Sequence, residues 1–430
     1  MLAIGVLLQK RSTNTGSYRL RQLSGGSPLV KRSWRVFDVN GPVESTNQEP
    51  YDNTAKTGDL VSGGSPILRV AREAFLPVGF PETVSAKYIE YIRYNMIQVT
   101  FISMSRVLAT QAMLFAVGLG QGSALPIAAV MNWLLKDGLG HVGSIVVGTR
   151  INTKFDSDPK RYKFLSVSLG QLANLLGILS LAKPGMFLLL TSLSSALSRV
   201  GTLAITSSRA RIYANFSLAG NLGDLMRCSQ AQSTLATLMG TALGVITSPL
   251  VGADIQSILS VFCPVTVLTH IYAYKAVAVI ELRTLNRQRL ELIVSDWMRN
   301  KVVPSVASVA SHEKFIASKR IFPVHVNPDI SADLVNQDFI EKMADQGFCV
   351  HVSGSKVSVN FREGISPETA AKGFTEACFV ASEILSKTSG RNLIAFEWDS
   401  FWKELGDAGW DTSVTFIDRV EKRVRLEKNY

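Results

Sequence analysis

The sequence predicts a mainly α-helical fold, with a helical membrane-type domain followed by a small α+β C-terminal module. Three observations lead to this prediction. Five stretches in the middle of the 430-residue chain contain no Asp, Glu, Lys or Arg. The mean hydropathy of +0.18 is what a chain that is half membrane-like and half soluble would average. Beyond residue 304 the apolar runs are replaced by short strand-like and helix-like patterns.

The first 37 residues have the composition of an organelle transit peptide. They contain seven of the 45 Lys and Arg residues and none of the 34 acidic residues. We therefore expect an organelle membrane, mitochondrial rather than plastid, although an ordinary disordered basic tail would have the same composition. Since the excess positive charge is concentrated here, nucleic acid is not an expected partner. Residues 38–71 are rich in Pro, Gly, Ser, Asn and Asp and predict a flexible linker.

The predicted membrane-type domain covers residues 72–300. From Ser85 its first helix places Tyr88, Tyr91 and Ile92 on one face, which would lie on a membrane surface or pack on a core. The charge-free runs that follow are 107–135, 164–182, 184–198, 228–253 and 255–274. About 20 apolar residues cross a bilayer as a helix, so the last four runs predict four spans. Glycines interrupt the first run, which predicts a re-entrant hairpin or one kinked helix.

The charges between the runs predict a topology. With tight turns at 183–184 and at Asp254, the runs form two helical hairpins, 164–198 and 228–274. The segments 136–163, 199–227 and 275 onward then share one side. These segments are also the basic ones, as the positive-inside rule requires. The alternative is a soluble helical bundle with an unusually apolar interior.

One group of candidate functional residues lies at the end of the first run. Lys136 and Asp137 stand beside Gly138 and Gly140. Charged residues next to a membrane segment are functional candidates, and here the glycines would let the backbone approach a ligand. The alternative is an ordinary helix end, with glycine in the left-handed conformation and the charges in water.

Further candidates lie in and after the predicted basic loop 199–227. Arg209, Asn221 and Asp224 would bind an anionic substrate or a phosphate-bearing lipid, or else be solvated. Gly240 and Gly244 stand four residues apart within a span. Small residues at this spacing let two membrane helices approach closely, so they predict a helix-packing site. Such a site could also join chains into homo- or hetero-oligomers.

No catalytic residue, metal site or cofactor is predicted. The sequence has no zinc-protease motif, phosphate-binding loop or nucleophile elbow. Its four cysteines are far apart, which favours neither a zinc site nor a disulfide framework. We therefore do not expect an enzyme.

The C-terminal part, residues 313–430, predicts a small α+β domain. Strands are expected at 321–326, 349–352 and 356–361, and helices at 338–346, at 367–387 and from Trp398 onward. Before it, residues 281–300 predict a basic amphipathic helix that continues the last span. Because no cluster of reactive side chains is visible, we expect this domain to have a packing role or to bind a protein partner, rather than to carry out chemistry.

Four sequence blocks resemble the Root UV-B Sensitive family. They are residues 75–81 (FLPVGFP), 132–140 (NWLLKDGLG), 155–161 (FDSDPKR) and 221–224 (NLGD). The chain resembles a divergent member, similar over roughly residues 72–300. The resemblance implies a link to ultraviolet-B responses and vitamin B6 balance and, for several relatives, an organelle. It implies no catalytic residues, because the molecular activity of the family is not established.

Two functions remain open from the sequence. One is a transporter or channel-like protein in the lipid bilayer, with a solute path near the glycine-flanked charges. The other is a non-catalytic membrane scaffold or partner-binding protein in organelle homeostasis, whose C-terminal domain recruits proteins.

Overall fold

The structure, a computed structural model, divides into two units, residues 1–66 and 67–430. In the second unit it describes residues 72–118, 157–316, 320–329, 337–354, 356–386, 397–417 and 423–425, and the single positions 135, 138 and 141. In the first unit it describes the backbone of three antiparallel strands, β1 (Leu7–Gln9), β2 (Arg19–Ser24) and β3 (Ser33–Asp38). The sequence predicts no strands in this leader. From position 39 to 71 the predicted linker lies outside the described residues.

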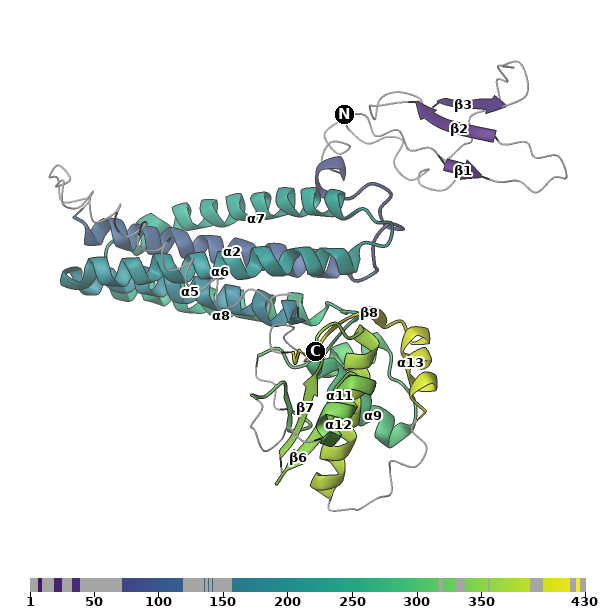
Figure 1. Cartoon of the computed structure of the whole chain (residues 1–430). Helices are drawn as coiled ribbons and strands as arrows, with labels where there is room; N and C mark the ends of the chain where they lie inside the picture. The colour runs from purple at the N-terminus through teal and green to yellow at the C-terminus, as the bar shows by residue number, and fades with distance from the viewer. Residues whose placement is uncertain are drawn as a thin grey trace. The chain divides into compact units, whose positions relative to one another are not determined.

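Five long helices form a bundle (Figure 1). They are α2 (Tyr88–Ala116), α5 (Pro159–Ala182), α6 (Phe187–Phe216), α7 (Leu222–Val251) and α8 (Ile255–Ala278). α2 packs on α5, α7 and α8, while α6 packs chiefly on α5. The mainly helical fold is confirmed.

Both predicted tight turns are present, but only α5 and α6 pack on each other as a hairpin, whereas α7 and α8 each pack on α2. A single 3₁₀ turn, Pro184–Met186, joins α5 to α6. α7 is joined to α8 through Gly252, at φ +63°, and Asp254, whose carboxylate accepts from Ser257 N. Glycine suits the first position because L side chains rarely adopt positive φ.

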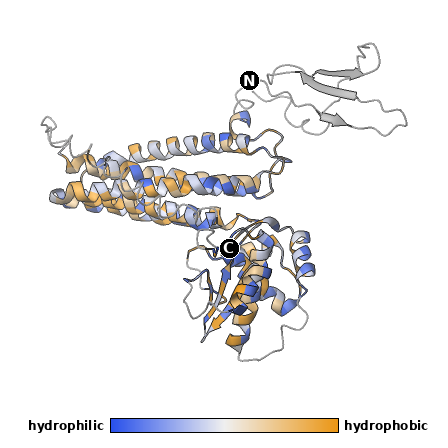
Figure 2. Cartoon of the chain, in the orientation of Figure 1, coloured by the Kyte–Doolittle hydropathy of each residue, from blue (hydrophilic) through white to orange (hydrophobic). Residues whose placement is uncertain are grey.

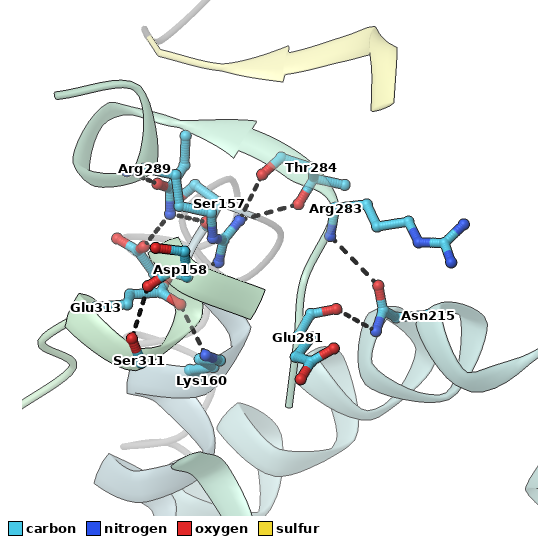
Figure 3. Close-up of polar contacts among 12 residues, drawn as sticks. Ser157, Asp158, Lys160, Asn215, Glu281, Arg283, Thr284, Arg289, Ser311 and Glu313 are labelled. Atoms are coloured by element: carbon cyan, nitrogen blue, oxygen red, sulfur yellow. Dashed lines mark hydrogen bonds and ion pairs between the residues drawn. The ribbon is translucent and has the colours of Figure 1, made fainter. Parts of the chain in front are cut away.

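The starts of α2, α5 and α7 and the ends of α6 and α8 lie together at one end of the bundle, here called the basal end. The start of α2 meets the end of α6, because Ser85 N donates to Phe216 O (3.0 Å). Asn215 links the end of α6 to the segment after α8 by donating to the Glu281 carbonyl (2.7 Å; Figure 3). The described parts of the three basic segments thus lie at the same end.

Two sequence predictions for the bundle are wrong. The described residues contain five candidate spans, not four, because residues 107–116 continue a helix that begins at Tyr88. The aromatic face of this helix packs in the protein core, which was one of the two predicted alternatives. Finally, 199–216 is helix and not loop, since Arg199, Arg209 and Arg211 all lie within α6. Positions 119–134 of the first run lie outside the described residues.

The outward surface of the bundle is apolar. All five helices are long and apolar enough to cross a membrane, and Figure 2 shows hydrophobic residues along their length. On α7, Leu238, Ile246 and Leu250 are 62%, 68% and 83% exposed. Soluble proteins rarely leave such a contiguous apolar surface in water. The exposure therefore favours a lipid-facing bundle over the soluble alternative.

The C-terminal domain is α+β, as predicted. Its helices are α9 (Arg287–Asn300), α10 (Val306–His312), α11 (Gln337–Asp345), α12 (Pro367–Ser386) and α13 (Trp398–Asp407). One sheet has the order β5 (Val324–Val326), β7 (Lys356–Phe361), β6 (Phe348–Ser353), with β5 parallel and β6 antiparallel to β7. A second sheet pairs β4 (Thr284–Asn286) in parallel with β8 (Asp411–Phe416). Phe361, Phe374 and Phe401 are fully buried in its core.

The predicted helix over 281–300 is wrong in its first part. The chain leaves the helix after Ala278, forms β4, and begins α9 at Arg287. Leu290, Ile293 and Val294 of α9 then join the C-terminal core. The packing unit therefore begins near β4, upstream of the predicted boundary at 313.

Candidate functional site

A buried ion cluster joins the bundle to the C-terminal domain at the basal end. Glu313 lies between two cations (Figure 3). Its Oε2 is 2.7 Å from Nζ of Lys160, in the first turn of α5, and its Oε1 is 2.9 Å from the guanidinium of Arg289, on α9. The three side chains are at most 3% exposed. Breaking such a buried pair leaves an uncompensated charge, so the cluster fixes the position of α9 against α5.

Asn286 completes this junction. Its side-chain oxygen caps α9 by accepting from Arg289 N (2.9 Å), and its amide donates to Ser157 O (2.9 Å) and to Asp158 Oδ1 (2.6 Å). Asn is common at the N-cap of a helix. Here the side-chain amide nitrogen of Asn286 also binds the residues just before α5. Ser157 and Asp158 of the FDSDPKR block thus contact Asn286, the last residue of β4 and the N-cap of α9.

The charges of the cluster depend on each other. Burial raises the pKa of Glu313, but Arg289 and Lys160 together lower it by more than burial raises it. The pKa of Glu313 therefore lies below the ordinary value of 4.5. Burial raises the pKa of Asp158 above its ordinary value, and Arg289 opposes this only in part. Glu313 is therefore the ionised partner that neutralises the cations. Because its partners enclose it, the cluster holds the two domains together and does not offer a substrate site.

A second group of cations lies among tyrosines inside the bundle. The Lys163 ammonium is 5.4 Å from the ring centre of Tyr91, and the Arg209 guanidinium is 5.8 Å from that of Tyr213. The two rings pack edge to face at 5.9 Å. Both contacts lie within the range of cation–π attraction. Lys163 also donates to Asn95 Oδ1 at 2.6 Å and is 3% exposed.

Buried polar side chains continue from Lys163 into the bundle between α2, α5 and α8. Gln171, two turns further along α5, donates to Ser105 of α2 (3.2 Å) and to Thr269 of α8 (2.9 Å). All three are at most 2% exposed. We call the set Asn95, Lys163, Ser105, Gln171 and Thr269 the polar seam. Hydrogen bonds between membrane helices stabilise packing modestly, yet the same side chains can line a path for a polar solute.

The bundle interior carries almost no negative charge. Among the described residues, the five helices contain two carboxylates, Glu90 and Asp224, each in the first turn of its helix at the basal end. The buried cation of the seam therefore has a carboxamide and a tyrosine face as partners, not a carboxylate. This leaves the inside of the bundle electropositive.

The predicted site residues of α6 and α7 that the structure describes make separate contacts. Arg209 donates to Ser229 Oγ (2.5 and 3.2 Å) and to Gln230 Oε1 (3.2 Å), facing α7. Asn221 precedes α7 and accepts from Ser217 Oγ (2.8 Å). Asp224 accepts from Val78 N (2.6 Å) and pairs with Arg227 (2.8 Å). Asp224 therefore holds the segment before α2 against the start of α7, and Asn221 fixes the turn between α6 and α7.

The structure describes the helix-packing pair, Gly240 and Gly244, but only one residue of the group around Lys136 and Asp137. Gly138 is described, with no atom near the position of a Cβ, whereas Lys136, Asp137 and Gly140 lie outside the described residues. Gly240 and Gly244 lie directly against α2. A Cβ on Gly240 would overlap the carbonyl oxygen of Thr100, and one on Gly244 would meet Val107 Cβ at 2.6 Å.

Sequence reasoning missed the ion cluster and the buried lysine. Two positions in the sequence could have indicated these lysines. Lys160 lies within the FDSDPKR block, and Lys163 directly precedes the charge-free run that begins at 164. Glu313 has no such signal, because its partners are distant in the sequence. Within the part of the chain that the structure describes, no three His, Cys, Asp or Glu residues could hold a metal ion.

These features fit a class of protein: an integral membrane protein with an apolar helical bundle and an α+β C-terminal domain. The chain belongs to the Root UV-B Sensitive family, because residues 63–301 match the family profile described as the vitamin B6 photo-protection and homoeostasis domain. It is 26% identical to protein root UVB sensitive 4 of Arabidopsis thaliana over 93% of this chain and 84% of the relative.

Two further relatives show the same relation. Protein root UVB sensitive 2, chloroplastic, of Arabidopsis thaliana is 30% identical over 61% of this chain and 60% of its own. RUS family member 1 of Dictyostelium discoideum is 27% identical over 67% of this chain and 55% of its own. No solved structure matches the chain.

Proposed function

We propose that this protein moves a small anionic solute across a membrane through the helical bundle, in the manner of a transporter or channel. The observation that carries the proposal is Lys163, a cation buried in an apolar bundle and held by Asn95 without a carboxylate partner among the described residues. Ionisable groups at membrane depth are costly and usually lie on a solute or ion path.

The polar seam supports this proposal. From Lys163 to Gln171 it advances by about 12 Å along α5, given a rise of 1.5 Å per residue, and each step joins α5 to α2 or α8. A path lined by amides, hydroxyls and one ammonium would favour an anion over a cation. The basal ion cluster would keep the C-terminal domain in place beneath the mouth of this path.

Uptake into proteoliposomes tests the proposal. The purified full chain is reconstituted and the uptake of labelled phosphate, citrate and pyridoxal 5′-phosphate is measured. The last is an anionic form of the vitamin named in the description of the family. We expect uptake of at least one anion above empty vesicles, reduced tenfold or more by Lys163→Gln. Lys183→Gln, at the exposed α5–α6 turn, is the matched control and should not change uptake.

The second candidate is a non-catalytic membrane scaffold. The observation that favours it is the buried junction of Lys160, Arg289 and Glu313, which holds a folded C-terminal domain rigidly against the bundle. If well-folded wild-type protein gives no uptake of any anion, while cross-linking in membranes joins the C-terminal domain to a defined protein, the scaffold replaces the transporter.

The membrane we propose is that of an organelle, mitochondrial before plastid. The basic, acid-free leader supports an organelle, while one relative is named chloroplastic. Import of the full chain into isolated mitochondria and chloroplasts in parallel, with protease protection as the readout, distinguishes the two. Import into chloroplasts alone would contradict the mitochondrial assignment.

A further inference from the structure

A cavity of about 500 Å³ lies between α2 and α7, outside the polar seam. From α2 it is lined by Arg106, Thr110 and Gln111, and from α7 by Thr241 and Ser248, among others. Nothing in the proposed solute path uses it.

The cavity exists because of how α7 meets α2. At Gly240 and Gly244 the two backbones approach so closely that no side chain fits between them. The cavity opens beside this contact, and Val107 and Thr241 are among the residues that line it. Its walls therefore belong to a fixed helix pair, since a close glycine contact leaves little freedom to slide.

Among the described residues, Arg106 is the only charged side chain in the wall of this cavity. It stands about 24 Å along α2 from Glu90, the one acid on that helix, at 1.5 Å per residue. The one acid on α7, Asp224, lies in its first turn, at the basal end. Within the described part of the bundle, the Arg106 guanidinium thus has no carboxylate to pair with. An arginine exposed on a spanning helix is costly in lipid unless an anionic or strongly polar group meets it.

Gln111 fixes one part of this wall. Its amide donates to Ser248 O (3.1 Å) of α7 and to Gly252 O (2.8 Å), directly after α7. Because Gln111 Oε1 is buried, it is closed to a molecule in the cavity. The Arg106 side chain is exposed and therefore accessible. The ligand is thus defined by Arg106 and carries an anionic oxygen.

We propose that this cavity binds a phosphate group, with Arg106 contacting its anionic oxygens. Arginine recognises phosphate through two parallel hydrogen bonds. Thr241 and Ser248 offer hydroxyls beside it, and Leu114 and Phe115 form an apolar wall for an attached chain. The phosphate belongs either to a lipid headgroup with a free monoester or to a water-soluble ester. The site requires that the helices lie in lipid, but not that the protein transports anything.

Binding to the purified full chain in detergent tests the site. Two probes are used: dioctanoyl phosphatidic acid, followed by native mass spectrometry, and radiolabelled inorganic phosphate, followed by equilibrium dialysis. Dioctanoyl phosphatidylcholine, which has no ionisable P–OH, is the lipid control. We expect Arg106→Gln to weaken binding at least tenfold and Thr241→Val, which keeps shape and removes one hydroxyl, to weaken it several-fold.

Arg93→Gln is the matched control, because Arg93 lies on the same helix but outside the cavity, and it should bind as the wild type does. Binding of phosphatidic acid alone identifies a lipid, and binding of phosphate as well identifies a soluble ester. The proposal fails if the wild type binds neither probe, if phosphatidylcholine binds equally well, or if both cavity variants bind like the wild type. Thr241→Val keeps the test valid if Arg106→Gln does not fold.

Discussion

Glu313 Oε2 lies 2.7 Å from Lys160 Nζ, so that a residue of the C-terminal domain neutralises a lysine in the first turn of a bundle helix. Neither side chain is more than 3% exposed. Arg289, on the other side of the same carboxylate, belongs to the helix that connects the two parts. The position of the C-terminal domain on the bundle is thus fixed by one carboxylate between two cations.

Glu313→Gln should destabilise this junction strongly. The substitution keeps the size of the side chain but leaves two buried cations without their counter-charge, which typically costs about 3–5 kcal/mol. Thermal unfolding of the purified protein should show the loss. Glu363→Gln, which breaks an exposed pair with Arg425, is the control and should change little. Equal stability of Glu313→Gln and the wild type would contradict the role given to the cluster.

The same residue predicts a pH dependence. Because the pKa of Glu313 in the folded protein is below its ordinary value of 4.5, its contribution to stability is complete above that value and is lost as the pH falls through the folded pKa. Asp158 acts in the opposite sense, because burial raises its pKa. The difference in stability between wild type and Glu313→Gln isolates the Glu313 contribution. It should be constant near neutrality and shrink below pH 4.5.

Gly240→Ala should separate α7 from α2. The new Cβ would overlap a backbone carbonyl of Thr100, which cannot rotate away. Overpacking of this kind costs about 1–3 kcal/mol. Gly223→Ala, on the same helix with no atom within 4 Å of the new Cβ, is the matched control and should be neutral or slightly stabilising. A cysteine pair across α2 and α7 that cross-links equally well in both variants would argue against the close contact.

Asp224→Ala should release the segment before α2. Its carboxylate accepts from Val78 N (2.6 Å) and orients Arg227, which in turn donates to Glu73 O (2.9 Å). Hydrogen exchange measured by mass spectrometry should therefore rise in peptides covering 73–83. Asp254→Ala, at the start of α8, should raise exchange only around its own helix end. Unchanged protection at 73–83 would mean that Gln232, which donates to Phe75 O (2.6 Å), is sufficient alone.

Local patterns predicted much of this fold. A charge-free run long enough to span a bilayer would expose much apolar surface to water if it formed a loop. Such runs therefore predicted α5 to α8 and the two turns that join them. The start of α2 was predicted as a helix from Ser85, but α2 was not predicted as a span because Glu90, Arg93 and Arg106 interrupt its otherwise apolar sequence. In the C-terminal domain, alternation and helical spacing located three strands and three helices.

The remaining features depend on residues far apart in the sequence. Residues 279–286 contain no Gly or Pro and are compatible with a helix, yet they leave it because β4 pairs with β8. No window around Glu313 reveals that Lys160 and Arg289 meet there. The cavity beside Arg106 likewise follows from the approach of α7 through Gly240, which the glycine spacing suggested without naming the partner helix.

The central claim is that the five apolar helices lie in a bilayer, and alkaline carbonate extraction of membranes from cells expressing the full chain tests it most directly. Carbonate strips proteins held at a membrane surface by charge but leaves those whose helices cross the hydrocarbon core. Exposed leucines such as Leu238 and Leu250 would have no other apolar surroundings. We predict that the protein stays in the membrane pellet. Its release into the supernatant as a monodisperse soluble protein would contradict the account.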